Sequence, residues 1–193
     1  DLEDAAPVVA KFYRPARWSD ATILEEHAFS LELAAEELPV VAPMVFDGAT
    51  LLRFAGHRFA VYPSVGGRAP EPGDPAQLEE LGRLLARLHA IGARQPYRHR
   101  RALTVEHFGD AALAALEASA LLPGSLRHNF MAAAADLLAA VRKRFEAVGP
   151  VRRQRIHGDC HPGNILVDRD RIRLLDLDDS VTGPAVQDLW MLL

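Results

Sequence analysis

Apolar residues follow two different periods along this chain, and the changes between them predict its elements. Residues 8–13 are β-branched and aromatic and precede Pro15, which predicts a strand. Residues 21–37 carry apolar side chains at three- and four-residue spacing behind Ser19 or Asp20 as a cap, which predicts a helix. Its apolar residues are Ile23, Leu24, Ala28, Leu31 and Ala35. Residues 50–54 and 58–62 then predict a hairpin of two strands.

The second half changes to long helical patterns and returns to short strands at its end. Residues 69–75 contain three prolines after the turn-rich residues 63–68, so regular helix cannot continue there. Further on, the spacing predicts helices over 77–91, 111–119 and 126–148, and strands over 155–156, 165–167 and 172–175. Leu78, Leu81, Leu84, Leu85 and Leu88 share one face of the first of these helices.

This order predicts an α+β fold in two lobes. We expect a partial, sheet-rich N-lobe over 1–65, a hinge over 66–76, and a partial C-lobe over 77–193 that carries the chemistry.

Composition and charge restrict the function classes. The chain has 193 residues, 49% of them hydrophobic and 25% charged, which is ordinary for a soluble globular protein. Its net charge of −4 argues against a large nucleic-acid interface, and no apolar stretch is long enough to span a membrane. Cys160 is the single cysteine, and the acidic residues 1–4 do not resemble a signal peptide. We therefore expect a cytoplasmic monomer.

The most informative segment is His157-Gly158-Asp159-Cys160-His161-Pro162-Gly163-Asn164, followed by Asp176 at the end of the last predicted strand. Asp159 and Asn164 are five residues apart in a loop between two strands. This Asp-x4-Asn spacing, with a later strand-end Asp, is the protein-kinase order of base, second metal ligand and first metal ligand. Amide and carboxylate oxygens are the donors that Mg²⁺ prefers.

The first half supplies the matching cation. Lys11 is one of two lysines in the chain and lies in a predicted strand, as a phosphate-binding lysine would. Its partner would be a glutamate of the following helix, Glu25 or Glu26, of which only one can face inward.

Other interpretations of these residues are weaker. A zinc site at His157, Cys160 and His161 would need a helix that Gly158 and Pro162 disfavour, and we interpret Cys160 as a packed thiol. The basic run Arg94, Arg98, His99, Arg100 and Arg101 could bind phosphate or an acidic partner, but such a run is more often a solvated loop. Arg152, Arg153 and Arg155 could steer anions toward the catalytic loop.

The sequence resembles the aminoglycoside/choline-kinase-like branch of the protein-kinase fold, and within it the bacterial stress-response serine/threonine kinases. The resemblance rests on HGDCHPGN at 157–164 and LDLDD at 175–179, and on KFYRPARW at 11–18, EEHAF at 25–29, FAVYPSVGGR at 59–68 and GPAVQDLWMLL at 183–193. Members of that family carry further chain before the lysine and after the last segment, so we expect an excerpt truncated at both ends.

The resemblance implies transfer of phosphate from ATP, with Mg²⁺ as cofactor, to Ser or Thr hydroxyls of proteins. Asp159 would accept the proton, Asn164 and Asp176 would hold Mg²⁺, and Lys11, oriented by Glu26, would hold the α- and β-phosphates. The backbone from Pro63 to Val65 would face the adenine, while His157 and Asp188 would support the catalytic loop. Two alternatives stay open: a small-molecule kinase of the same fold and a non-catalytic nucleotide-binding module.

Overall fold

The computed structural model describes residues 6–169 and 171–192. Its first part is a three-stranded antiparallel sheet in the order β1-β3-β2, formed by β1 (Val8–Phe12), β2 (Leu52–Phe54) and β3 (His57–Pro63). The register places Lys11 opposite Ala60 in the middle of the sheet. The predicted strand and hairpin are therefore confirmed, and Lys11 is held in regular structure. The expectations about residues 1–4, and about positions 170 and 193, lie outside the described residues.

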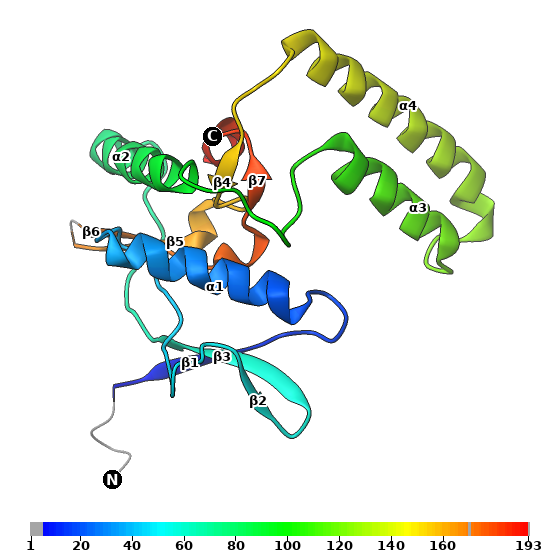
Figure 1. Cartoon of the computed structure of the whole chain (residues 1–193). Coiled ribbons are helices and arrows are strands. Elements are labelled where there is room, and N and C mark those ends of the chain that lie inside the picture. Colours follow the sequence, from blue (N-terminus) through cyan, green and yellow to red (C-terminus); the bar gives the residue numbers. More distant parts are fainter. Residues whose placement is uncertain (1–5, 170, 193) are drawn as a thin grey trace.

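Helix α1 (Asp20–Ala35) lies between this sheet and the rest of the molecule (Figure 1), and Ser19 caps its N-terminus by accepting from the Thr22 N–H. Its buried face differs from the apolar stripe that predicted the helix, because Leu24 is 45% exposed. The buried residues are Thr22, Ile23, Glu26, His27, Phe29, Ser30 and Leu33. Four of these seven are polar or charged, so α1 buries hydrogen-bonding and titratable groups as well as apolar side chains.

The second part begins with α2 (Pro75–Gly92), which Asp74 caps by accepting from two backbone N–H groups. Leu81, Leu84, Leu85 and Leu88 are buried as the spacing predicts, whereas Leu78 is exposed. Two antiparallel strand pairs complete this part: β4 (Gln154–Ile156) with β7 (Val181–Gly183), and β5 (Ile165–Asp168) with β6 (Arg171–Leu174). Short helix α5 (Val186–Trp190) follows β7.

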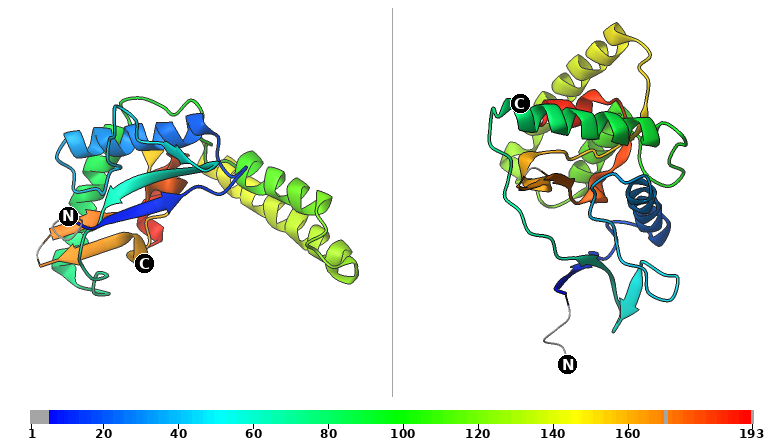
Figure 2. Two further views of the ribbon diagram at one scale, coloured as in Figure 1. Left: turned by 90° about the horizontal axis from the view of Figure 1, so that it is seen from below. Right: turned by 90° about the vertical axis from the view of Figure 1, so that its left-hand side faces the viewer.

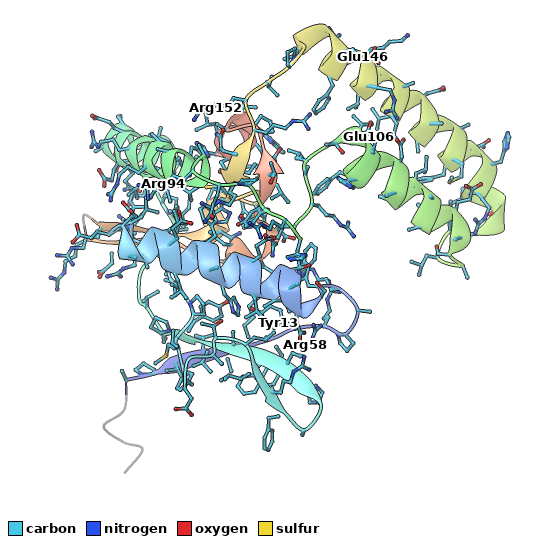
Figure 3. The ribbon with its side chains drawn as sticks, viewed as in Figure 1. Tyr13, Arg58, Arg94, Glu106, Glu146 and Arg152 are labelled. Carbon is cyan, nitrogen blue, oxygen red and sulfur yellow. The ribbon has the colours of Figure 1, made fainter. Side chains whose placement is uncertain are left out.

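A helical hairpin projects away from this body (Figure 2). It is formed by α3 (Ala111–Ala118), which continues the short π-helix η2 (Glu106–Asp110), and by α4 (Gly124–Val148). Glu106 lies at the base of the hairpin (Figure 3), where Arg142 of α4 forms ion pairs with Glu106 and Asp110. None of the residues of α3 or α4 is buried.

One apolar cluster joins the two parts of the molecule. Phe29 and Leu33 of α1 pack in it with Leu85 and Leu88 of α2 and with Leu174 of β6. The sheet itself has only a small cluster of its own around Tyr13, Ile23 and Ala60. Helix α1 therefore belongs to the core of the second part as much as to the first, and it fixes how the sheet sits over β5 and β6. In the described ranges, every helix is too short or too polar to cross a lipid bilayer.

Candidate active site

A cavity of about 480 Å³ lies between the sheet and the second part of the molecule. Its walls come from β1, β3, the linker after β3, α1 and the ends of β5 and β6. Apolar side chains form most of the wall, and Lys11, Glu26 and Asp176 supply the charged groups; the wall consists of Val9, Ala10, Lys11, Glu26, Val41, Tyr62, Pro63, Ser64, Val65, Leu166, Leu175, Asp176 and Leu177. The cavity therefore brings together Pro63, Val65, Lys11, Glu26 and Asp176, which the sequence analysis had selected from distant segments.

Lys11 crosses this cavity to the second part of the molecule. Its Nζ lies 2.6 Å from Oδ1 of Asp176 and 3.7 Å from Oδ1 of Asp178. The predicted contact between Lys11 and Glu26 is not formed. The reason is the stronger acidic cluster opposite, where two carboxylates converge on the ammonium group, while the Glu26 carboxyl is turned toward its own helix.

Glu26 is buried next to the cavity with an incomplete set of partners. It is 2% exposed, Oε1 accepts a hydrogen bond of 2.8 Å from the Ser30 hydroxyl, and Oε2 has no hydrogen-bond partner among the described residues. Burial raises the pKa of Glu26 to about 7, although the Ser30 hydrogen bond and the charge of Lys11 oppose the rise. Glu25 points elsewhere and accepts from the backbone N–H groups of residues 98–100. Of the two glutamates, Glu26 is thus the inward one.

Asp159 and Asn164 lie in the loop after β4, where Pro162–Asn164 forms a short 3₁₀ turn. Nδ2 of Asn164 donates to the backbone carbonyl of Asp159 at 2.8 Å and to its Oδ2 at 3.2 Å. Gly158, just before Asp159, has φ +85°, and a Cβ there would lie 2.3 Å from the carbonyl oxygen of Asp179. Glycine is therefore required for the loop to lie this close to residues 177–180.

The buried side chains of His157 and Asp188 hold the backbone of this loop by hydrogen bonds. Both carboxylate oxygens of Asp188 accept backbone N–H groups, from His157 at 3.0 Å and from Gly158 at 2.8 Å, and His89 Nε2 lies 2.8 Å from Oδ2. Nε2 of His157 lies 2.7 Å from the carbonyl oxygen of Leu175 and must donate to it. This leaves Nδ1 to accept from the Asp159 N–H at 3.4 Å. Two fully buried side chains thereby connect the Asp159 loop to the strand end that carries Asp176.

Asp176 adopts the left-handed conformation, with φ 53°, and caps the one-turn 3₁₀ helix η4 (Leu177–Asp179). Burial opposes its ionisation, but the hydrogen bond and charge of Lys11 outweigh burial and hold the pKa of Asp176 below its usual range. Oδ1 of Asp176 is used by Lys11 and by the Asp178 N–H. Oδ2 of Asp176 and the amide oxygen of Asn164 have no hydrogen bond among the described residues, so two hard oxygen donors are available. Such a pair fits Mg²⁺, which is usually held by one or two carboxylates together with substrate phosphates.

A second cavity, of about 460 Å³, is lined by Asp159 and shares η4 with the first, because Leu177 lines the first cavity and Asp179 lines the second. Its wall is formed by Arg17, Trp18, Arg101, Leu103, Phe108, Gly158, Asp159, Asp179, Val181 and Gln187. The sequence analysis did not assign a site to Arg17 or Trp18, and it considered Arg101 only as part of a basic run that is more often a solvated loop. The conspicuous segment 11–18 contains two of them, but only the fold brings them to the Asp159 loop.

Two expectations about basic residues are wrong at one residue each, Arg155 and Arg100. Arg155 is 3% exposed and pairs with Glu32 at 2.7 Å while its guanidinium lies over the Phe29 ring, so it cannot steer anions in solvent. Arg100, within the run expected to be a solvated loop, is 7% exposed and donates to three backbone carbonyls. Cys160 is confirmed as a packed thiol, since it is fully buried and burial raises its pKa to about 12.

Comparison with known proteins shows the family of this chain. The sequence matches the phosphotransferase enzyme family (APH) over residues 1–193. It is 46% identical over 191 residues to stress response kinase A of Escherichia coli strain K12, and 44% identical to serine/threonine protein kinase RdoA of Salmonella typhimurium strain LT2. Each alignment covers 99% of this chain and 57% of the relative, so the chain spans little more than half the length of these relatives.

Solved structures support the same fold. The amicoumacin kinase hAmiN, in complex with AMP-PNP, Ca²⁺ and Ami, superposes with a TM-score of 0.75 over 98% of this chain and 57% of that one, at 19% identity. A microcompartment-associated aminopropanol kinase superposes with a TM-score of 0.70 over 96% and 62%, at 22% identity. The predicted α+β, kinase-like fold is therefore confirmed. The chain belongs to the phosphotransferase enzyme family.

Proposed function

We propose that this chain carries the nucleotide site and catalytic loop of an ATP- and Mg²⁺-dependent serine/threonine protein kinase that acts in a bacterial stress response. The observation that carries the proposal is the arrangement around η4. Residues of η4 line both a cavity with Lys11 and Asp176 and a cavity with Asp159, and the Asn164 side chain is hydrogen-bonded to Asp159. Donor and acceptor of a phosphoryl group would meet between them.

The nucleotide would occupy the first cavity. Its apolar wall, including Pro63 and Val65, suits the flat face of an adenine, and Lys11 would move its charge from Asp176 to the phosphates. Asn164 and Asp176 would hold Mg²⁺, which when bound would neutralise charge on the transferring phosphate. The ion pair of 2.6 Å between Lys11 and Asp176 indicates that these two groups already lie within reach of one small ligand.

Asp159 would accept a hydrogen bond, and then the proton, from the acceptor hydroxyl. The Asn164 amide orients its carboxylate, and the Asp188–His157 contacts fix the backbone on which it stands. Phosphoryl transfer needs little covalent assistance, so positioning and charge neutralisation would provide most of the rate.

The choice of a protein hydroxyl as acceptor is supported by the names of the relatives with the highest sequence identity given above. A protein 44% identical to this chain is named a serine/threonine protein kinase. The small-molecule kinases that share the fold are 19% and 22% identical and support the fold alone.

The proposal is tested with the full-length gene product, labelled ATP and Mg²⁺, beside an Asp159→Asn variant. We expect label on serine or threonine of the protein itself or of a generic protein substrate, and none with the variant. ATP turnover that occurs only when small hydroxyl compounds are added would instead identify a small-molecule kinase. Mg·ATP binding without any turnover would identify a non-catalytic module.

A further inference from the structure

The second cavity is lined by two arginines, Arg17 and Arg101, and by two carboxylates, Asp159 and Asp179, but only Arg17 is paired with one of them. Three guanidinium groups surround the indole ring of Trp18: that of Arg17 at 5.3 Å, that of Arg100 at 5.1 Å and that of Arg101 at 5.8 Å from the ring centroid. Arg17 forms ion pairs with Asp178 at 3.2 Å and with Asp179 at 2.8 Å. Arg100 is buried and used by backbone carbonyls. The guanidinium of Arg101 has neither an ion pair nor a hydrogen bond with the described residues.

Arg101 is also held in place. Its backbone carbonyl accepts from the Thr182 N–H at 3.1 Å, and the Leu103 N–H donates to the Thr182 carbonyl at 2.8 Å, so the segment runs beside β7. The side chain is exposed and lines the cavity with Asp159. An exposed cation on an ordered backbone, with no partner among the described residues, favours a ligand that brings a negative charge.

The carboxylates of this cavity do not offset Arg101. Asp179 is already paired with Arg17, and Asp159 is the group that would face the acceptor hydroxyl. A cavity for a polycationic acceptor would need free carboxylates, and among the described residues that line it there is none besides Asp159. The remaining wall is apolar and aromatic, with Trp18, Leu103, Phe108 and Val181.

We propose that Arg101 selects acidic peptides, in which Asp or Glu flanks the serine or threonine that receives phosphate. This inference rests on the proposed kinase function and names its substrate class. The acidic side chain would pair with the Arg101 guanidinium over the Trp18 ring while the hydroxyl reaches Asp159.

The test uses three serine peptides of one sequence whose flanking positions are all Glu, all Gln or all Lys. kcat/KM is measured for each with the full-length protein. We expect the order Glu, Gln, Lys, with steps of about threefold to fivefold, because exposed ion pairs contribute up to about 1 kcal/mol each. The preference should weaken as ionic strength rises. Arg101→Gln should bring the three values together, and Arg101→Glu should reverse their order.

Arg98→Gln is the matched control, since it removes the same charge from an exposed side chain of the same loop outside the cavity. It should keep the wild-type order. Mg·ATP affinity, measured for every variant, checks that the first cavity is intact. Equal use of the three peptides by the wild type, or an acidic preference that survives Arg101→Gln, would overturn the inference and leave the kinase proposal standing. If the wild type phosphorylated none of the peptides and no protein, the proposed function itself would fail, and this inference with it.

Discussion

At the scale of single residues, the most consequential contact is the ion pair between Lys11 and Asp176. It connects the sheet to the second part of the molecule. In the proposed function, Lys11 would bind the phosphates of the nucleotide and Asp176 would bind the metal. Asp176 occupies a left-handed conformation that is uncommon for a non-glycine residue and is stabilised here by its capping role at η4. The side chain is half exposed, so the pair itself adds little stability, and its value is positional.

Asp176→Ala should abolish binding of Mg·ATP, because it removes the only carboxylate proposed for the metal together with the anchor of Lys11. Calorimetric titration of Mg·ATP into the variant measures this. Asp136→Ala is the control, since Asp136 is exposed on α4, far along the chain from both cavities. An unchanged dissociation constant for Asp176→Ala would contradict the assignment.

Asp159→Asn should remove most turnover and leave nucleotide affinity nearly intact. The amide cannot take the proton of the acceptor hydroxyl, and general-base assistance is worth about 10²–10⁴ in rate. Asp159 lines the second cavity and not the first, so loss of kcat without loss of ATP affinity is the distinguishing result. A variant with the wild-type rate would refute the assignment.

At the scale of elements, α1 carries a buried pair of titratable neighbours whose pH effects oppose each other. Burial raises the pKa of Glu26 from 4.5 to about 7, and burial, with the charges of Lys11 and Arg100, lowers the pKa of His27 from 6.5 to about 4. The native state therefore keeps a proton on Glu26 that the unfolded chain loses near pH 4.5, so this residue reduces stability as pH rises to about 7. His27 has the reverse effect between about pH 4 and 6.5, because the unfolded chain protonates first. Across the shared range the two contributions largely cancel.

Glu26→Gln should expose this compensation. The difference in free energy of unfolding, variant minus wild type, should grow by about 3 kcal/mol between pH 4.5 and pH 7, from the change in the pKa of Glu26. Urea unfolding at a series of pH values measures it. Glu146→Gln on the surface of α4 should give a difference that does not change with pH. A pH-independent difference for Glu26→Gln would show that folding does not raise the pKa of Glu26.

The same helix shows why the sequence predicts where an element begins and ends better than it predicts which side of that element is buried. The period and the Ser19 cap of α1 are local, so its limits follow from the sequence to within two residues. Its buried face carries Glu26, His27 and Ser30, whose burial depends on Tyr13, Thr50 and the cavity, so apolar spacing could not identify it. Strand β7 was missed for a similar reason. It has only three residues, and its backbone partners are β4 and the segment around Ala102, both far away along the chain.

The candidate site also contains residues that local spacing identifies and residues that only the fold brings together. Asp159, Asn164 and Asp176 are marked by their spacing, because one loop and one hairpin hold all three. The carboxylate that pairs with Lys11 is that of Asp176, 165 positions along the chain. Spacing alone favours Glu26, because only the fold brings the acidic segment after β6 opposite Lys11. The second cavity collects side chains from four separate segments, and the sequence contains no local signal for that.

At the scale of the whole molecule, the two parts behave as one body because they share a core and a set of buried arginine contacts. Phe29 and Leu33 of α1 lie in the same apolar cluster as α2 and the β5–β6 pair. Arg155 binds Glu32 of α1 and the carbonyl of Ile91 at the end of α2. We therefore expect a single cooperative unfolding transition, in which loss of fluorescence and of helical signal coincide.

Arg100 is the residue on which that unity depends most. Its guanidinium donates buried hydrogen bonds to the carbonyl oxygens of Thr22 in α1, of Ser180 before β7 and of Asp178 in η4. Arg100→Met should lower the free energy of unfolding by about 3 kcal/mol or more, because three buried carbonyls lose their donor at about 1–3 kcal/mol each. Urea denaturation measures the loss, and Arg98→Met, exposed on the same loop, should cost well under 1 kcal/mol.

Arg100→Lys separates charge from geometry: one ammonium cannot reach three carbonyls that a planar guanidinium spans, so it should recover only a minor part of the loss. Equal stability of the Arg100 and Arg98 variants would mean that the shared apolar core alone holds η4 against α1.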